Sequence, residues 1–236
     1  MPSRTLLLTT AALALALTGA PGSASATSSP TPDRPATAPQ QAAAPGVLLH
    51  QAVADLPTAV EDRTGYKRSS FRHWIDADRN GCNARAEVLL TEAVTAPTVE
   101  PGCRLVGGTW YSYYDDQTVE GSAGLDVDHL VPLAEAWDSG ASAWTAQQRQ
   151  DYANDLADDY HLVAVTARSN RSKADKDPSQ WLPPSEGARC RYVAEWTAVK
   201  RNWDLTVDEQ EKAALTALAA ECPDVPLPGP AEPQSP

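Results

Sequence analysis

Seven stretches of the chain are predicted to form helices. Residues 47–59 and 188–203 have apolar residues at helical spacing, and the others are indicated mainly by capping residues and by residues that break helices. Two of them follow a side chain able to accept hydrogen bonds from the first turn. These side chains are Asn83 and Thr145, and Gln148 completes a capping box with Thr145. Thr206 is expected to cap the last helix, with Glu209 three residues on. The predicted helices cover residues 47–59, 84–93, 134–137, 146–154, 166–173, 188–203 and 207–221.

Three shorter stretches have the character of β-strands. In the second of them, Asp126 and Asp128 share one face and His129 lies on the other, because side chains alternate along a strand. Pro132 cannot donate a ladder hydrogen bond, so this strand should end there. The predicted strands cover residues 103–114, 125–133 and 161–165. From these strands and helices together we expect one domain of the α+β class.

Both ends of the chain differ in composition from its centre. Residues 1–26 combine an early Arg4, a short apolar run and small residues before a cleavage site after Ala26, so we interpret them as a signal peptide of an exported protein. A retained signal anchor is the alternative, but the run is shorter than the ~20 residues a spanning helix needs. Segments 27–46 and 223–236 are rich in Pro and small residues and are expected to be a disordered leader and tail. The folded domain is therefore placed at 47–222.

The four cysteines, Cys82, Cys103, Cys190 and Cys222, all lie in that domain. An even number of cysteines in an exported protein favours two disulfides. Of the three possible pairings we expect the sequential one, Cys82–Cys103 with Cys190–Cys222, which closes two local loops. A zinc site made of four thiolates is the alternative, but the irregular spacing contains no CxxC pair.

The formal net charge of −12 bears on function, because proteins that coat nucleic acid need many Lys and Arg residues. Such a protein is disfavoured. An enzyme that must release its product needs only a local basic patch, and the densest basic cluster is Arg168, Arg171, Lys173 and Lys176.

Several polar residues near the second and third strands suit phosphodiester hydrolysis. An imidazole can remove a proton from water, while a divalent cation on oxygen ligands neutralises charge on the phosphate. His129 is the candidate general base, and Asp128 and Asn170 are candidate metal ligands. Lys173 lies one helical turn after Asn170 and could contact phosphate. Asp126, on the same strand face as Asp128, is a candidate for positioning the metal or the substrate.

These residues resemble a known motif. Asp126-Val-Asp-His-Leu-Val-Pro132, His161-Leu162 and Asn170-Arg-Ser-Lys173 look like the three parts of the HNH nuclease ββα-metal motif, with His161 and Asn170 nine residues apart. The resemblance implies an α+β fold with a ββα-metal core and additional helices. It also implies a metal-dependent endonuclease with DNA as its expected substrate and RNA as the alternative, and Mg²⁺ or Mn²⁺ as the metal. Arg171 is a further candidate phosphate contact.

The resemblance extends over roughly residues 50–222, to exported HNH proteins that are similar to the C-terminal domain of GmrSD-type restriction enzymes. Through it, Arg85 and Glu87 become candidate neighbours of the active site. The chain departs from the family at His161, where most HNH proteins have Asn. We expect His161 to hold the metal loop through one ring nitrogen, and Asn154 is a candidate replacement for the missing Asn. The zinc-binding CxxC pairs of many HNH proteins are also missing, and the disulfides are expected to take over their bracing role.

Two other functions fit parts of the sequence. Asp76-Ala-Asp-Arg-Asn-Gly81 is similar to the start of an EF-hand loop, and Glu87 falls at its twelfth position. This pattern would suit a secreted, non-catalytic, calcium-stabilised binding module. The second alternative is a hydrolase of another phosphodiester. We favour a secreted, monomeric nuclease with no membrane contact after signal cleavage.

Overall fold

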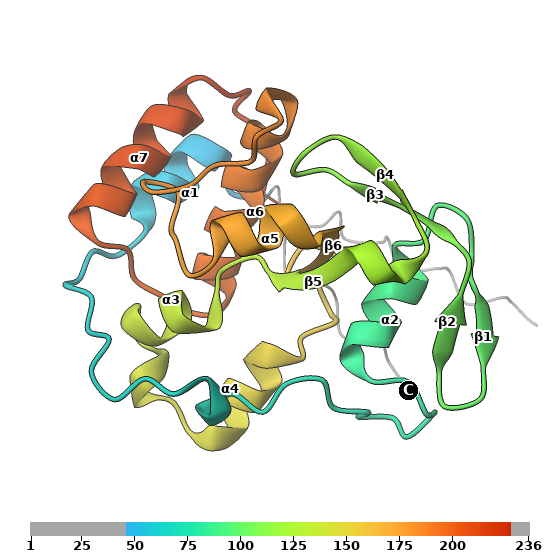
Figure 1. Cartoon of the computed structure of the whole chain (residues 1–236). Coiled ribbons are helices and arrows are strands. Elements are labelled where there is room, and N and C mark those ends of the chain that lie inside the picture. Colours follow the sequence, from blue (N-terminus) through green and yellow to red (C-terminus); the bar gives the residue numbers. More distant parts are fainter. Residues whose placement is uncertain (1–45, 228–236) are drawn as a thin grey trace, which may run out of the picture. The chain divides into compact units, whose positions relative to one another are not determined.

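The computed structural model describes residues 46–227 (Figure 1). The expected signal peptide, nearly all of the leader and the last nine residues of the tail therefore lie outside the described residues. Within 46–227, no helix has the length and apolar character needed to cross a membrane.

The described part of the chain combines helices with short antiparallel sheets, so the α+β class is confirmed (Figure 1). The α-helices are α1 (Leu49–Asp55), α2 (Ala84–Thr91), α3 (Leu133–Asp138), α4 (Ala146–Ala153), α5 (Ala167–Lys173), α6 (Arg189–Asn202) and α7 (Glu209–Ala220). The strands are β1 (Thr98–Glu100), β2 (Arg104–Val106), β3 (Thr109–Ser112), β4 (Gln117–Glu120), β5 (Leu125–His129) and β6 (Leu162–Thr166). Short 3-10 helices are η1 (Arg68–Ser70), η2 (Ser122–Gly124), η3 (Ala141–Ala143) and η4 (Glu186–Ala188).

Helix capping follows the sequence in two of the three predicted cases. Asn83 accepts from the third residue of α2, and Thr145 forms the full capping box of α4. The prediction for Thr206 is wrong. Its hydroxyl instead donates to Ser139 O, and Asp208 caps α7 by accepting from the Glu211 backbone N–H.

The strands form three separate two-stranded antiparallel sheets, β1–β2, β3–β4 and β5–β6. The single strand expected at 103–114 is in fact two strands, β2 and β3, which belong to different sheets. Gly107 and Gly108 separate them and both have positive φ, 71° and 81°, a conformation that glycine adopts without steric strain. A Cβ at Gly108 would also lie 2.7 Å from the Trp110 ring.

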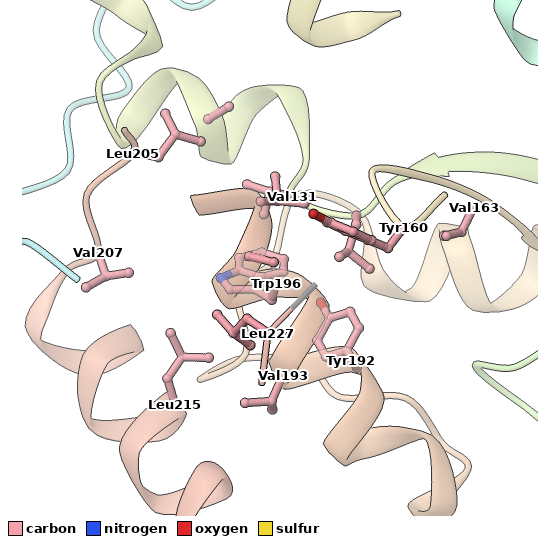
Figure 2. Packing of buried hydrophobic residues seen from close by; sticks show 14 of the residues in the cluster. Val131, Tyr160, Val163, Tyr192, Val193, Trp196, Leu205, Val207, Leu215 and Leu227 are labelled. Carbon is pink, nitrogen blue, oxygen red and sulfur yellow. The ribbon is translucent and has the colours of Figure 1, made fainter. Parts of the chain in front are cut away.

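Two hydrophobic clusters share the β5–β6 sheet. The larger includes Trp196 and Tyr192 of α6 and Leu215 of α7 (Figure 2). The smaller is built around Trp110 with Leu125 and Val127 of β5. Alternate residues of β6 enter different clusters, Val163 and Val165 the larger, Leu162 and Ala164 the smaller. A strand that is buried on both faces has a continuous run of apolar residues. The sequence of β6 has such a run at residues 162–165.

Both disulfides have the sequential pairing, Cys82–Cys103 and Cys190–Cys222. The second joins the start of α6 to the residues just after α7. The folded part extends past residue 222, contrary to the expected start of the tail. Leu227 is 8% exposed, and its N–H donates to Val47 O. Burial of that leucine keeps residues 223–227 beside α1.

Candidate active site

The site forms where α5 packs on the β5–β6 sheet (Figure 1). β5 and β6 pair in register, with Asp128 opposite Val163 and His129 opposite Leu162. α5 begins directly after β6, and Thr166 caps it by accepting from Ser169 N. Because no loop separates β6 from α5, the side chains of α5 lie over the face of β5 that carries Asp126 and Asp128.

Asn170 lies next to Asp126 on this face. Its Nδ2 donates to Asp126 Oδ2 at 3.0 Å. A carboxylate accepts hydrogen bonds and cannot donate them, so this contact fixes which end of the amide faces Asp126. The other end, Oδ1, is left available as a neutral oxygen ligand. Asp126 therefore fixes the orientation of the Asn170 amide, and its Oδ2 also lies 3.5 Å from Arg171 Nε.

Asp128 is paired with Lys173 beneath the surface. Lys173 Nζ donates to Asp128 Oδ2 at 2.7 Å and to the backbone oxygen of His129 at 3.0 Å. Tyr114 OH donates to the same Oδ2, so Oδ1 of Asp128 accepts no hydrogen bond within residues 46–227. Burial raises the pKa of Asp128 and lowers that of Lys173, while their mutual attraction opposes both shifts.

The role of phosphate contact predicted for Lys173 is wrong. Its side chain is completely buried, and its ammonium is held by Asp128 and His129. A substrate phosphate could reach it only if the helix moved away. Lys173 instead links α5 to the end of β5.

His129 is buried at the end of β5, with its ring orientation fixed by two contacts. Its Nε2 lies 3.0 Å from Ala153 O, and the Trp74 ring packs on it at 5.3 Å between centroids. A carbonyl can only accept, so Nε2 carries the proton and Nδ1 is the basic atom of the neutral ring. Burial holds the pKa of His129 well below its ordinary value, and the nearby His161, Arg68 and His73 lower it further.

His161, like His129, binds a backbone carbonyl at the C-terminal end of α4. Its Nε2 lies 2.7 Å from Tyr152 O, the carbonyl preceding the one that binds His129. Its backbone oxygen accepts from Leu130 N. His161 thus binds a backbone carbonyl through one ring nitrogen, at the C-terminal end of α4. Its role in holding a metal loop stays a prediction.

Asn154 also forms hydrogen bonds with backbone groups. These groups are not in the metal loop, where a residue replacing the missing Asn of the HNH motif was expected to bind. Its Oδ1 accepts from Ile75 N, and its Nδ2 donates to Arg72 O and Gln150 O. These bonds tie the segment that carries Trp74 to the end of α4. Asn154 thereby acts on His129 indirectly, through the tryptophan that packs on it.

A pocket of about 320 Å³ brings several of these groups together. Asp128, His129, Asn170 and Arg171 all line it. Arg68, from η1, lines it as well and forms no ion pair with any residue of 46–227. The side chain of Arg171 is 76% exposed. The pocket thus offers an imidazole, the oxygen atoms of Asp128 and Asn170, a second carboxylate from Asp175 and two accessible guanidinium groups.

Arg85 and Glu87 do not belong to this pocket, contrary to expectation. Arg85 donates to Leu125 O at the start of β5, and Glu87 accepts from Asn80. Both residues lie on α2 and so hold the turn and strand next to that helix.

The Asp76–Gly81 loop is held together by its own hydrogen bonds. Asp76 accepts from Gly81 N, and Asp78 accepts from both the backbone and the side chain of Asn80. Among the described residues, the only three acidic or imidazole groups whose ligand atoms converge lie elsewhere. This geometry fits a structural turn better than the calcium site of the alternative function.

The sequence assigned no functional role to three residues near the pocket: Arg68, and the adjacent His73 and Trp74, which were interpreted as packing or surface residues. The His73 ring lies 6.2 Å from the ring of His129. Trp74 has a positive φ of 58°, which a sequence pattern does not reveal. The one available signal was the density of basic and aromatic residues at 67–74.

The donor set suits a small divalent cation. Asp128 Oδ1 and Asn170 Oδ1 are hard oxygen atoms that accept no hydrogen bond from the described residues. Magnesium is often held by only one or two carboxylates and completes its coordination with water and phosphate. The converging acidic group, Glu61, Glu135 and Glu211, does not suit a metal, because Lys200 Nζ already binds Glu135 and Glu211 at 2.6 and 3.1 Å.

The family model for the C-terminal domain of GmrSD restriction endonucleases matches residues 87–218, more than half of the chain. The chain belongs to this family. The matched part of this GmrSD C-terminal domain protein contains β5, β6 and α5, and the family indicates a nuclease-type function. No solved structure matches the chain.

A relative from Arthroderma benhamiae, named "Uncharacterized secreted protein", is 42% identical over 158 residues. The similarity covers 67% of this chain and 76% of the relative. With two disulfides in its fold, this member of the GmrSD C-terminal domain family is a secreted protein.

Proposed function

We propose that the protein is a metal-dependent endonuclease of the ββα-metal type that hydrolyses phosphodiester bonds in nucleic acid, with DNA as the expected substrate and RNA as the alternative. The observation that best supports this is the bond from His129 Nε2 to Ala153 O beside Asp128 and Asn170. It leaves a neutral imidazole with a basic Nδ1 in a pocket that also contains oxygen ligands.

In this proposal His129 Nδ1 accepts the proton of the attacking water, while Ala153 O and Trp74 keep the ring in place. Asp128 and Asn170 would hold one Mg²⁺ or Mn²⁺ ion, which supplies charge neutralisation for the phosphate and the leaving oxygen. Asp126 keeps the Asn170 amide oxygen available. Arg171 and Arg68 contact the phosphate, in place of the buried Lys173.

The test is cleavage of supercoiled plasmid DNA and of RNA with Mg²⁺ or Mn²⁺. We expect wild-type protein to nick DNA, and His129→Ala to lose a factor on the order of 10²–10⁴, the usual contribution of a general base. His50→Ala is the matched control, because His50 lies on α1 and binds carbonyls at the end of α7.

The proposal fails if wild-type protein leaves both nucleic acids intact with every divalent ion tried, or if His129→Ala cleaves as well as His50→Ala. A melting temperature that rises with calcium, in the absence of any cleavage, would favour the calcium-stabilised binding module instead. Inhibition by DNA of the hydrolysis of a small chromogenic diester would show that both use this pocket.

A further inference from the structure

A second pocket, also of about 320 Å³, lies between α2, the Ile75–Cys82 turn and the segment Asn154–Leu162. This volume is at the lower end of the range seen for small-molecule sites. Asp128, His129, Asn170 and Arg171 do not line it, so it is distinct from the pocket proposed for cleavage.

Its walls are largely apolar. Val88 and Ala84 contribute from α2, Leu162 from β6, and Ile75 and Leu156 from the connecting segments. A concave apolar surface of this kind gains free energy by covering the apolar part of a ligand.

The charged residues that line the pocket all have the same sign. They are Asp78, Glu87, Glu92, Asp155, Asp158 and Asp159, with no Lys or Arg among the lining residues. Such a site is complementary to a cation.

Glu92 gives a specific contact point. Its Oε2 accepts from Ala164 N at 3.0 Å, but Oε1 is buried and has no hydrogen-bond partner among the described residues. A buried acceptor without a partner is unfavourable, so a donor supplied by a ligand would stabilise it. Burial raises the pKa of Glu92 to about 7; Arg191 of α6 lowers it, and Glu195 and Asp159 raise it.

We propose that this pocket binds a small organic cation, a primary ammonium on a short apolar chain. The ammonium binds at the Glu92 carboxylate, and the chain covers Val88 and Leu162. Neither the ligand class nor the site depends on the nuclease activity.

The test uses n-hexylammonium as the probe and isothermal titration calorimetry with the full secreted chain. We expect saturable binding at one site, and binding of n-hexanol at least about tenfold weaker, because it has the same apolar chain without the charge. Glu92→Gln should weaken n-hexylammonium binding about tenfold. Glu209→Gln, an exposed carboxylate at the start of α7, should leave it unchanged.

A second measurement needs no variant. The ammonium keeps its proton in the neutral range, whereas Glu92 loses its own near pH 7. Binding to wild-type protein should therefore strengthen as the pH rises through this value. Absence of saturable binding, equal affinity for hexanol, or equal affinity of the Glu92→Gln variant would each overturn the proposal. None of these results would affect the cleavage test.

Discussion

At the scale of single residues, burial decides what a charged side chain can do. Lys173 and Arg171 lie two residues apart on α5 and differ completely in exposure. The first is enclosed with Asp128, and the second lies at the pocket surface. We therefore expect substitutions at the two positions to affect different properties.

Replacing Lys173 by Met should mainly destabilise the fold. Removal of one partner from a buried ion pair leaves the other charge uncompensated, which costs about 3–5 kcal/mol of unfolding free energy. Lys176→Met is the control, because Lys176 is exposed and binds only Ser172 O, so its loss should be within about 0.5 kcal/mol. Urea unfolding measures both. Equal stability of the two variants would contradict this.

The sequence indicated which residues meet but not how they are used. Asp128, His129 and Asn170 were predicted from the chemistry of their side chains and from the resemblance to the HNH motif, and the structure places all three at one pocket. The burial of Lys173 and the proximity of Arg68 depend on how α5 and η1 pack, which no local pattern records.

At the scale of elements, the C-terminal end of α4 is the support for His129. Tyr152 O binds His161 and Ala153 O binds His129, so two imidazoles hold adjacent carbonyls. Asn154 then ties the neighbouring segment to the same helix end.

This arrangement predicts different results for two substitutions of His161. An Asn amide can still donate to Tyr152 O, so cleavage by His161→Asn should stay within about tenfold of wild type. His161→Leu fills the space without a donor and should lose a further 10-fold to about 100-fold, the usual effect of a residue that supports the reacting groups. Plasmid nicking rates, with melting curves to show folding, would separate them. Equal rates would mean that the hydrogen bond is unimportant.

A buried ionic group joins α6, α3 and α7. Lys200 Nζ binds Glu135 and Glu211, and burial raises the pKa of Glu211 from its ordinary 4.5 to about 8. Between these pH values Glu211 keeps its proton when folded and loses it when unfolded. The folded state thus binds more protons, and Glu211 makes stability fall as the pH rises from about 4.5 to about 8.

Glu211→Gln should therefore weaken this fall in stability. Gln keeps an acceptor for Trp196 Nε1 but cannot ionise. We expect the decline in unfolding free energy between about pH 5 and about pH 8 to shrink by about 3–4 kcal/mol, the amount that this shift in pKa contributes over that range. The control is Glu209→Gln, which changes an exposed carboxylate of the same helix and should retain the wild-type pH dependence of stability. If Glu211→Gln also retained it, the prediction would be wrong.

Elements with strong local signals could be predicted, and weaker ones could not. The caps of α2 and α4 and the apolar run of β6 were all read correctly. β1 and β4 were missed because they are short and mostly exposed, so no alternation marks them. Thr206 was misread as a cap because its bond to Ser139 joins parts of the chain that are 67 residues apart.

At the scale of the whole molecule, two hydrophobic clusters meet at one strand pair, and each has its own disulfide nearby. Cys190 and Cys222 pack on the larger cluster, while Cys82 and Cys103 connect the turn before α2 to the β1–β2 sheet. Because β6 contributes to both clusters, we expect the described part to unfold as one unit.

Removing either disulfide should thus destabilise all of it. The loops they close span 21 and 32 residues, and loop entropy predicts a loss of about 3–4 kcal/mol for each of the double variants Cys82→Ala/Cys103→Ala and Cys190→Ala/Cys222→Ala. Fluorescence and circular dichroism should report a single transition at the same urea concentration. Separate transitions would show that the two clusters unfold independently.

The small number of cations at the pocket, where Asp128 and Asp175 lie beside two arginines, has a consequence for how long a polyanion stays bound. Arg68 and Arg171 are the cations that line the pocket, on a chain whose net charge is −12. Few counterions would be released on binding, so the complex would be short-lived. A nuclease of this kind would work distributively, leaving each molecule after one cut, and early in a digestion the nicks would be spread thinly over the whole population.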